Sequence, residues 1–199
     1  MENSLVLLGC GSVGSFLSQY AIRSSLFRYE TIYLVDNDRV EEKNLGNQAY
    51  SGMDVGRAKT RALSDQILGL RPDIPVVTIS ERLSFANAKA VLRKALAKGC
   101  DIVCCFDNIE SRLVAKSLGF EYDLNVLHVA TSPDWIVAMW NDAYYPSESG
   151  EDACEFGNVT ISVLAALTGL EALERYWIAQ ETTNFVVSTR SVASQTHTS

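Results

Sequence analysis

The sequence predicts an α/β protein with a Rossmann-like, doubly wound and mostly parallel sheet and a long C-terminal crossover helix. Strand-like and helix-like segments alternate along the chain, which is the pattern that builds parallel sheets. A glycine-rich turn over residues 9–14 joins the first strand to the first helix. The apolar fraction of 47% over 199 residues suffices for one core. We therefore expect a single nucleotide-binding domain over residues 1–190 and a disordered, Ser/Thr-rich tail over residues 191–199.

Each strand is predicted from a short apolar or β-branched run, and each helix from apolar residues near helical spacing. Strands are expected at residues 4–8, 31–35, 75–80, 101–106, 124–129, 135–140 and 185–189. Helices are expected at residues 12–23, 57–70, 86–98, 109–120 and 158–180. Two long polar loops remain, at residues 36–54 and 141–157, and loops of that length in a compact domain are usually functional.

Composition excludes several classes of function. The formal net charge of −7 argues against nucleic-acid binding. No apolar run is long enough to span a bilayer, and no basic segment followed by an apolar stretch marks a signal peptide. We therefore expect a cytoplasmic protein that binds neither nucleic acid nor membrane.

The glycine turn and the acid that follows it predict a nucleotide site. Gly9, Gly11 and Gly14 let the backbone approach a phosphate, and the helix that follows them offers N–H donors. Asp36 ends the second strand about 20 residues later, where an acidic side chain accepts ribose hydroxyls. These two features fit NAD and ATP equally.

Three charged residues shift the balance towards a triphosphate. Asp38 is surplus for a dehydrogenase, although it could be a solvated loop acid. Lys59 begins a helix and could reach a triphosphate if it faces the glycine turn; otherwise it is a surface lysine. Asp107 ends a strand at the ligand-binding edge and is a candidate magnesium ligand. Asn108 could cap the next helix, where Arg112 either pairs with Asp107 or faces solvent.

Together these segments resemble the ubiquitin-activating superfamily of adenylyltransferases, of the ThiF/MoeB/HesA type. The family pattern is a glycine loop, then D-x-D-x-V-x-x-x-N-L-x-R-Q, then G-x-x-K, then a strand ending in D-N with an arginine behind it. The resemblance covers residues 5 to about 178. The matching segments are residues 36–48, 56–59, 106–108 with Arg112, the Cys154-Glu155-Phe156-Gly157 run and residues 168–174.

The resemblance implies an enzyme that binds Mg-ATP and the C-terminus of a ubiquitin-like protein, a sulfur-carrier protein or a peptide. The C-terminal carboxylate would attack the α-phosphate, giving an acyl-adenylate and pyrophosphate. Catalysis would depend on positioning and charge neutralisation. The resemblance also implies a homodimer, a magnesium ion on Asp107 and catalytic roles for Lys59, Asp107 and Cys154. It assigns nucleotide binding to Gly9, Gly11, Gly14, Asp36, Asp38, Asn44, Gln48, Lys59 and Asp107.

The chain departs from the family pattern at several points. Asn47 stands where the family has an arginine, and Arg39 and Arg57 are the nearby candidates to replace that charge. No helix precedes the first strand, whereas the family uses one to lend an arginine to the partner subunit. The chain also ends soon after the crossover helix, as a minimal version of the family would. The zinc-binding C-x-x-C pairs are absent, so no structural zinc is expected.

Cys154 has two interpretations. Its thiolate could take the acyl group from the adenylate, since it lies in a polar loop. The acidic neighbours Glu151, Asp152 and Glu155 oppose thiolate formation, while the start of the following helix would favour it. The alternative is an unreactive loop cysteine.

Three hypotheses for function follow, in order of preference. The first is the adenylyltransferase. The second is a non-catalytic subunit of the same fold that pairs with an active protomer, which Asn47 favours. The third is an NAD-dependent oxidoreductase, which explains the glycines and Asp36 but leaves Lys59 and Asp107 unexplained and lacks a recognisable catalytic constellation.

Overall fold

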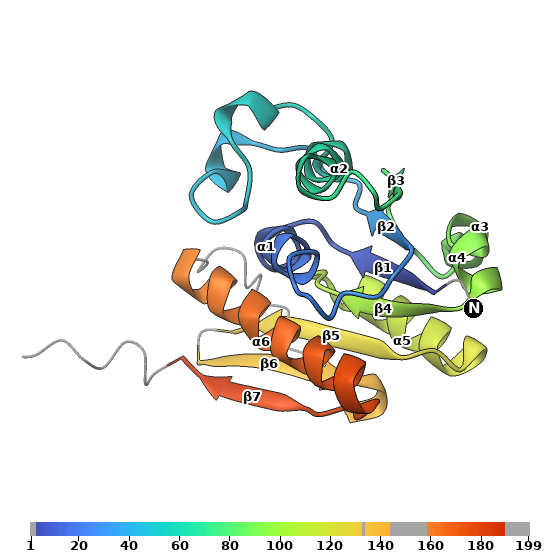
Figure 1. The fold of residues 1–199 in the computed structure, drawn as a ribbon. Coiled ribbons are helices and arrows are strands. Elements are labelled where there is room, and N and C mark those ends of the chain that lie inside the picture. Colours follow the sequence, from blue (N-terminus) through green and yellow to red (C-terminus); the bar gives the residue numbers. More distant parts are fainter. Residues whose placement is uncertain (1–2, 133, 144–158, 190–199) are drawn as a thin grey trace, which may run out of the picture.

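One seven-stranded sheet runs through the part of the chain that the structure describes, in the order β3-β2-β1-β4-β5-β6-β7 (Figure 1). This computed structural model describes residues 3–132, 134–143 and 159–189. The strands are β1 (Ser4–Leu8), β2 (Thr31–Val35), β3 (Val76–Ile79), β4 (Cys100–Cys104), β5 (Val126–Thr131), β6 (Trp135–Trp140) and β7 (Phe185–Ser188). Each lies where the sequence predicted a strand, with boundaries that differ by one or two residues at most.

Parallel and antiparallel strands occupy different parts of the sheet. Strands β3, β2, β1, β4 and β5 pair in parallel, whereas β6 and β7 are added antiparallel. The chain moves outward from β1 to β3 and then returns to place β4 on the other side of β1. Such a reversal opens a crevice at the carboxyl ends of the strands, where open α/β sheets bind ligands. The predicted mostly parallel, doubly wound sheet is therefore confirmed, with its switch point between β1 and β4.

Helices cover both faces of the sheet, as Figure 1 shows. Core residues of α1, α2 and α6 pack with Leu5 and Leu7 of β1, while those of α3, α4 and α5 pack with Val6 and Leu8. The predicted long C-terminal helix is α6, which lies against α1, β5 and β6. Among the described helices, none has both the length and the apolar character that crossing a bilayer needs. The helices are α1 (Ser12–Ala21), α2 (Lys59–Leu70), α3 (Ala88–Val91), α4 (Arg93–Lys98), α5 (Ile109–Tyr122) and α6 (Val159–Ala179).

Two predicted segments differ in detail from the structure. The single helix expected over residues 86–98 is divided into α3 and α4 at Leu92, whose backbone dihedrals of φ −96° and ψ 7° leave the helical region. Leu92 is fully buried in the core, and such packing overrides local helix propensity. The loop over residues 36–54 contains two 3₁₀ turns, η1 (Glu42–Asn44) and η2 (Gly52–Asp54), and a third, η3 (Asn141–Ala143), follows β6. The predicted tail over residues 191–199 lies outside the described residues.

Candidate functional site

The turn between β1 and α1 combines two packing glycines with one open position. Gly9 has φ +93°, a conformation that favours glycine, and a Cβ on Gly14 would lie 2.0 Å from the Gly9 carbonyl oxygen. No atom lies within 4 Å of the Cβ position at Gly11. Gly9 and Gly14 therefore bring the ten-residue helix α1 close to the strand end, while Gly11 borders space that a ligand can enter.

Asp36 directly follows β2, the strand beside β1, and its side chain holds the glycine turn. Only 5% of this residue is exposed. Its carboxylate accepts hydrogen bonds from the backbone N–H groups of Cys10 at 2.7 Å and Asp38 at 2.8 Å. Burial raises the pKa of Asp36 above its ordinary value, although nearby Lys59 opposes the shift. Because a carboxylate has about four acceptor sites, Asp36 can still accept ribose hydroxyls.

Lys59 is a buried cation, so the alternative of an ordinary surface lysine is wrong. It begins α2, is 6% exposed, and its Nζ lies 2.9 Å from Oδ2 of Asp38. The pair is fixed by the backbone: Lys59 N–H donates to the Asp38 carbonyl oxygen at 2.9 Å, next to a bridge between Arg39 and Ala58. Lys59 also lies near the glycine turn, because the Tyr50 hydroxyl is 3.4 Å from the Lys59 carbonyl oxygen and 2.6 Å from that of Cys10.

Asn44 and Gln48 are both buried, but the structure gives them different surroundings. Asn44 Oδ1 accepts a hydrogen bond from the backbone N–H of Glu41 at 2.9 Å and so shapes the turn η1. Gln48 is 7% exposed, and in the described part of the chain no donor reaches its Oε1 or the buried Oδ1 of Asn47. Buried acceptors are normally satisfied, so these two oxygens are suited to donors of a bound ligand.

Two residues that the sequence analysis missed attach this loop to the glycine turn. Ser15 Oγ of α1 accepts a hydrogen bond from the backbone N–H of Ala49 at 3.0 Å. The buried Tyr50 hydroxyl donates to the carbonyl oxygen of Cys10 at 2.6 Å. Neither residue belongs to a recognisable motif; the only sequence signal was a serine on the first helical turn and an aromatic residue in a polar loop.

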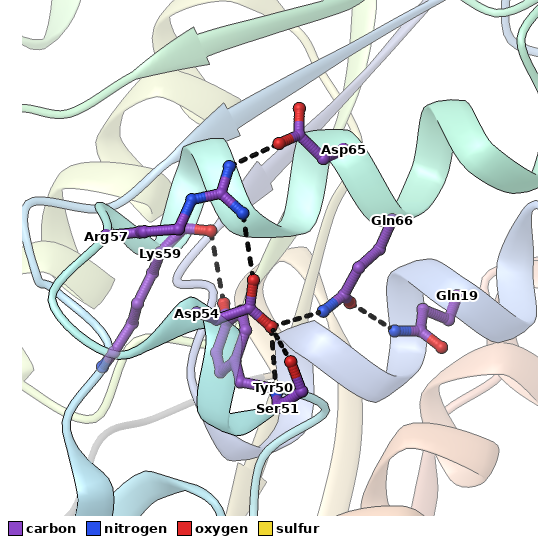
Figure 2. A network of polar contacts seen from close by, with 8 residues as sticks. All are labelled: Gln19, Tyr50, Ser51, Asp54, Arg57, Lys59, Asp65 and Gln66. Carbon is purple, nitrogen blue, oxygen red and sulfur yellow. Dashed lines mark hydrogen bonds and ion pairs between the residues drawn. The ribbon is translucent and has the colours of Figure 1, made fainter.

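Arg39 and Arg57 are the candidates to replace the missing family arginine, and both bind groups of their own loop region instead. Arg57 pairs with Asp54 at 3.1 Å and with Asp65, and Figure 2 shows Arg57 and Lys59 extending in different directions from the start of α2. Arg39 is exposed and donates to a backbone carbonyl of the same loop at 2.6 Å. In this structure, these arginines stabilise the loop.

The segment after β4 contains one exposed acid and one buried arginine. Asp107 is exposed, and Asn108 caps α5 by accepting a hydrogen bond from the backbone N–H of Ser111 at 2.8 Å, as predicted. Arg112 is only 6% exposed and donates to the carbonyl oxygen of Val129 at 3.2 Å. The alternative in which Arg112 faces solvent is therefore wrong.

The segment that leads to Asp107 lies against the glycine turn. Cys105 N–H donates to the carbonyl oxygen of Leu8 at 2.7 Å, and a Cβ on Gly9 would lie 2.9 Å from the Cys105 carbonyl carbon. Asp107 therefore follows the same edge of the sheet as Asp36. In the described ranges, no group of three His, Cys, Asp or Glu could hold a metal by itself. A magnesium ion at Asp107 would thus take most of its oxygen ligands from phosphates and water, which suits this ion.

The predicted nucleophile Cys154 lies outside the described residues, so its role stays a prediction. Of the cysteines in the described ranges, Cys10, Cys104 and Cys105 lie nearest the glycine turn. Burial raises the pKa of each of these thiols above its ordinary value. They are therefore protonated core residues near neutral pH and poor nucleophiles.

Solved structures share this fold. The chain superimposes on a crystal structure of PaaA with a TM-score of 0.71 and 17% identity, covering 95% of this chain and 61% of that chain. It superimposes on E. coli MccB with ATP with a TM-score of 0.66 and 18% identity, covering 93% of this chain and 63% of that chain. At such identities these likenesses demonstrate the fold alone.

Sequence comparison gives the family. A model described as the ThiF family matches residues 1–197. The Sus scrofa protein named adenylyltransferase and sulfurtransferase MOCS3 is 27% identical over an alignment of 189 residues, which covers 86% of this chain. The chain spans 39% of the length of that relative. The resemblance inferred from the motifs is therefore confirmed.

Proposed function

Because the chain belongs to the ThiF family, we propose that it is an ATP-dependent adenylyltransferase. It activates the C-terminal carboxylate of a ubiquitin-like protein, a sulfur-carrier protein or a short peptide. One carboxylate oxygen forms a bond to the α-phosphorus, the bond from that phosphorus to the β-phosphate bridge breaks, and pyrophosphate leaves. The names of the relatives, which include adenylyltransferases, support this reaction class.

One observation carries the proposal: the buried lysine Lys59 lies beside a glycine turn that is itself held by the buried carboxylate of Asp36. Lys59 is 6% exposed and Asp36 is 5% exposed. In this structure Asp38 compensates the buried ammonium group, and the phosphates of a nucleotide are anions that can also bind it. The pyrophosphate of a dinucleotide would also be an anion for Lys59, so the preference for ATP over NAD rests on the family and on the relatives named as adenylyltransferases.

The residues of the site divide the work of binding and charge neutralisation. The N–H groups at the start of α1 receive phosphate oxygens, and Asp36 accepts the ribose hydroxyls. Lys59 neutralises charge on the phosphates, which increases as pyrophosphate departs. Magnesium, held by Asp107, would add further neutralisation. Gln48 offers a buried acceptor oxygen to a donor of the nucleotide.

Thermal melting tests the site directly. A ligand at a hundredfold its dissociation constant adds about 2.7 kcal/mol, or roughly 5–10 °C for a chain of this size. We expect this rise with Mg-ATP and no rise with NAD. Lys59→Met removes the rise, while Arg61→Met, which deletes an exposed charge from the same helix, leaves it unchanged. A rise with NAD alone contradicts the proposal.

Pyrophosphate exchange tests the reaction. Labelled pyrophosphate enters ATP only if an adenylate forms reversibly, so exchange must depend on an added protein or peptide with a free C-terminus. A peptide with an amidated C-terminus serves as the control and supports no exchange. Exchange that is equal with both peptides would contradict activation of a C-terminal carboxylate.

The second candidate is a non-catalytic subunit of the same fold, and one observation favours it. Asn47 replaces a family arginine, and the structure engages Arg39 and Arg57 elsewhere. Such a subunit would bind Mg-ATP yet give no exchange until an active protomer is added. With the first candidate function we also propose a homodimer and a cytoplasmic location. Light scattering of the purified chain measures its oligomeric state.

A further inference from the structure

The ion pair between Lys59 and Asp38 joins two residues of very different exposure. The Lys59 side chain is 8% exposed, whereas that of Asp38 is 58% exposed, and their charged atoms are 2.9 Å apart. A buried ammonium group depends on nearby anions, and both Asp38 and Asp36 lie near Lys59. A half-exposed carboxylate that leaves the pair regains water at little cost. Asp38 is therefore the member of the pair that can withdraw into solvent when another anion replaces it at Lys59.

The backbone around this pair does not have to move when the pair opens. The Lys59 N–H donates to the Asp38 carbonyl oxygen, and the Asp38 N–H donates to Oδ1 of Asp36. Val40 N–H also donates to the Arg57 carbonyl oxygen at 2.9 Å. These bonds fix both main chains, so rotation of the Asp38 side chain is enough to separate the two charges.

Repulsion between like charges also favours withdrawal of Asp38 when a triphosphate arrives. Asp36 and Asp38 contribute two carboxylates beside one ammonium group, which gives this part of the site a net negative charge when all are ionised. A polyphosphate entering towards Lys59 would meet the Asp38 carboxylate at the same position. Like charges at such close range repel each other, whereas the ammonium group attracts both anions.

We propose that Asp38 is a positioning residue, a displaceable counter-ion that holds Lys59 in the nucleotide-free site and yields it to the phosphates of ATP. This inference rests on the proposed function, since it concerns the same site. Asp38 keeps the buried ammonium group compensated and correctly oriented before ATP binds. The exchange of one anion for another makes binding depend on phosphate, because adenosine alone cannot displace Asp38.

Calorimetric titration of Asp38→Asn with Mg-ATP and with adenosine tests the proposal. We expect Mg-ATP to bind about tenfold more tightly, because the competing carboxylate is gone, while the affinity for adenosine stays unchanged. Glu42→Gln is the matched control, since it removes one exposed acid from the same loop, and it should leave both affinities within about twofold. Weaker binding of Mg-ATP to Asp38→Asn would overturn the proposal, because it would show that Asp38 favours nucleotide binding instead of competing with it.

A double-mutant cycle separates displacement from simple repulsion. In a Lys59→Met background, where Mg-ATP binding is weaker and is titrated at higher nucleotide concentration, Asp38→Asn should no longer tighten that binding, because no ammonium group remains to be exchanged. An equal gain in both backgrounds contradicts displacement. If Asp38→Asn does not fold, the carboxyl carbon resonance of Asp38 in the wild-type protein gives the same information. It should shift on titration with Mg-ATP and stay unchanged with adenosine, and a constant signal in both titrations overturns the proposal.

These outcomes are distinct from failure of the proposed function. A wild-type chain that binds Mg-ATP and shows the Asp38 effect, but gives no pyrophosphate exchange, retains the inference and loses the reaction. A chain that supports exchange without any Asp38 effect retains the reaction and loses the inference.

Discussion

The two ends of the sheet each bury a carboxylate, but they satisfy it in different ways. Near the amino ends of the strands, Asp101 of β4 is 4% exposed and accepts hydrogen bonds from the Tyr29 hydroxyl at 2.8 Å and the Asn125 amide at 3.3 Å. Trp177 Nε1 donates to the same Tyr29 oxygen at 3.0 Å. At the carboxyl ends, Asp36 accepts its two bonds from backbone N–H groups beside a charged pair.

This difference distinguishes a network whose hydrogen bonds are internal to the protein from a site that still offers polar groups to a ligand. The Asp101 carboxylate accepts its bonds from two neutral side chains, Tyr29 and Asn125, so these bonds are internal to the protein. Around Asp36 the ion pair of Lys59 has a half-exposed partner, and the buried Gln48 Oε1 has no donor within the described residues. Polar groups that are buried but incompletely satisfied cost stability, and proteins retain them where they bind ligands.

The largest predicted effect comes from the glycine turn. Gly14→Ala places a Cβ 2.0 Å from a backbone oxygen, so we expect a loss of at least about 3 kcal/mol or failure to fold. Gly11→Ala meets no atom within 4 Å and should cost about 1 kcal/mol or less, yet weaken Mg-ATP binding. Urea unfolding and calorimetry measure the two effects. Equal losses of stability would show that Gly11 is also a packing glycine.

The next effect should break the network at the amino ends without touching the site. Asp101→Ala leaves the Tyr29 hydroxyl without its acceptor and removes one of the two acceptors of the Asn125 amide, which should cost about 1–3 kcal/mol of unfolding free energy. The affinity for Mg-ATP should stay within about twofold. Glu30→Ala, at a neighbouring exposed position, is the control and should change stability by about 0.5 kcal/mol at most. A large loss of nucleotide affinity in folded Asp101→Ala would refute the division between the two ends.

The smallest effect on stability should come from Asp36→Asn, and it should depend on pH. Burial raises the pKa of folded Asp36, so the ionised carboxylate destabilises the fold at pH 7, and this penalty disappears below its ordinary pKa. Asparagine never ionises. The melting temperature of the variant relative to wild type should therefore increase from pH 4 to pH 7, and a difference that does not change with pH counts against this explanation. Mg-ATP should bind about 10- to 100-fold more weakly, because the ribose loses a charged acceptor.

Local sequence rules were sufficient for the order of strands and helices and for the glycine turn. Hydrophobic periodicity is a property of short segments, so β1 and α1 could be assigned without knowledge of their neighbours. Parallel strands share one carboxyl edge, and Asp36 could therefore be placed there from its position after β2. The helix divided at Leu92 shows the limit, since core packing overrode a continuous helical pattern.

The sequence by itself determined the family, the doubly wound sheet and the edge at which the nucleotide site lies, because these follow from short-range patterns and strand connectivity. Only the tertiary structure decided that Lys59 is buried against Asp38, that Arg57 is held by Asp54 and that Arg112 lies inside. The partners of a charged side chain are separated in sequence and are brought together by loop pairing, which no local pattern encodes. For this reason the sequence could name the charges of the site, whereas the fold alone determined which anion each cation faces.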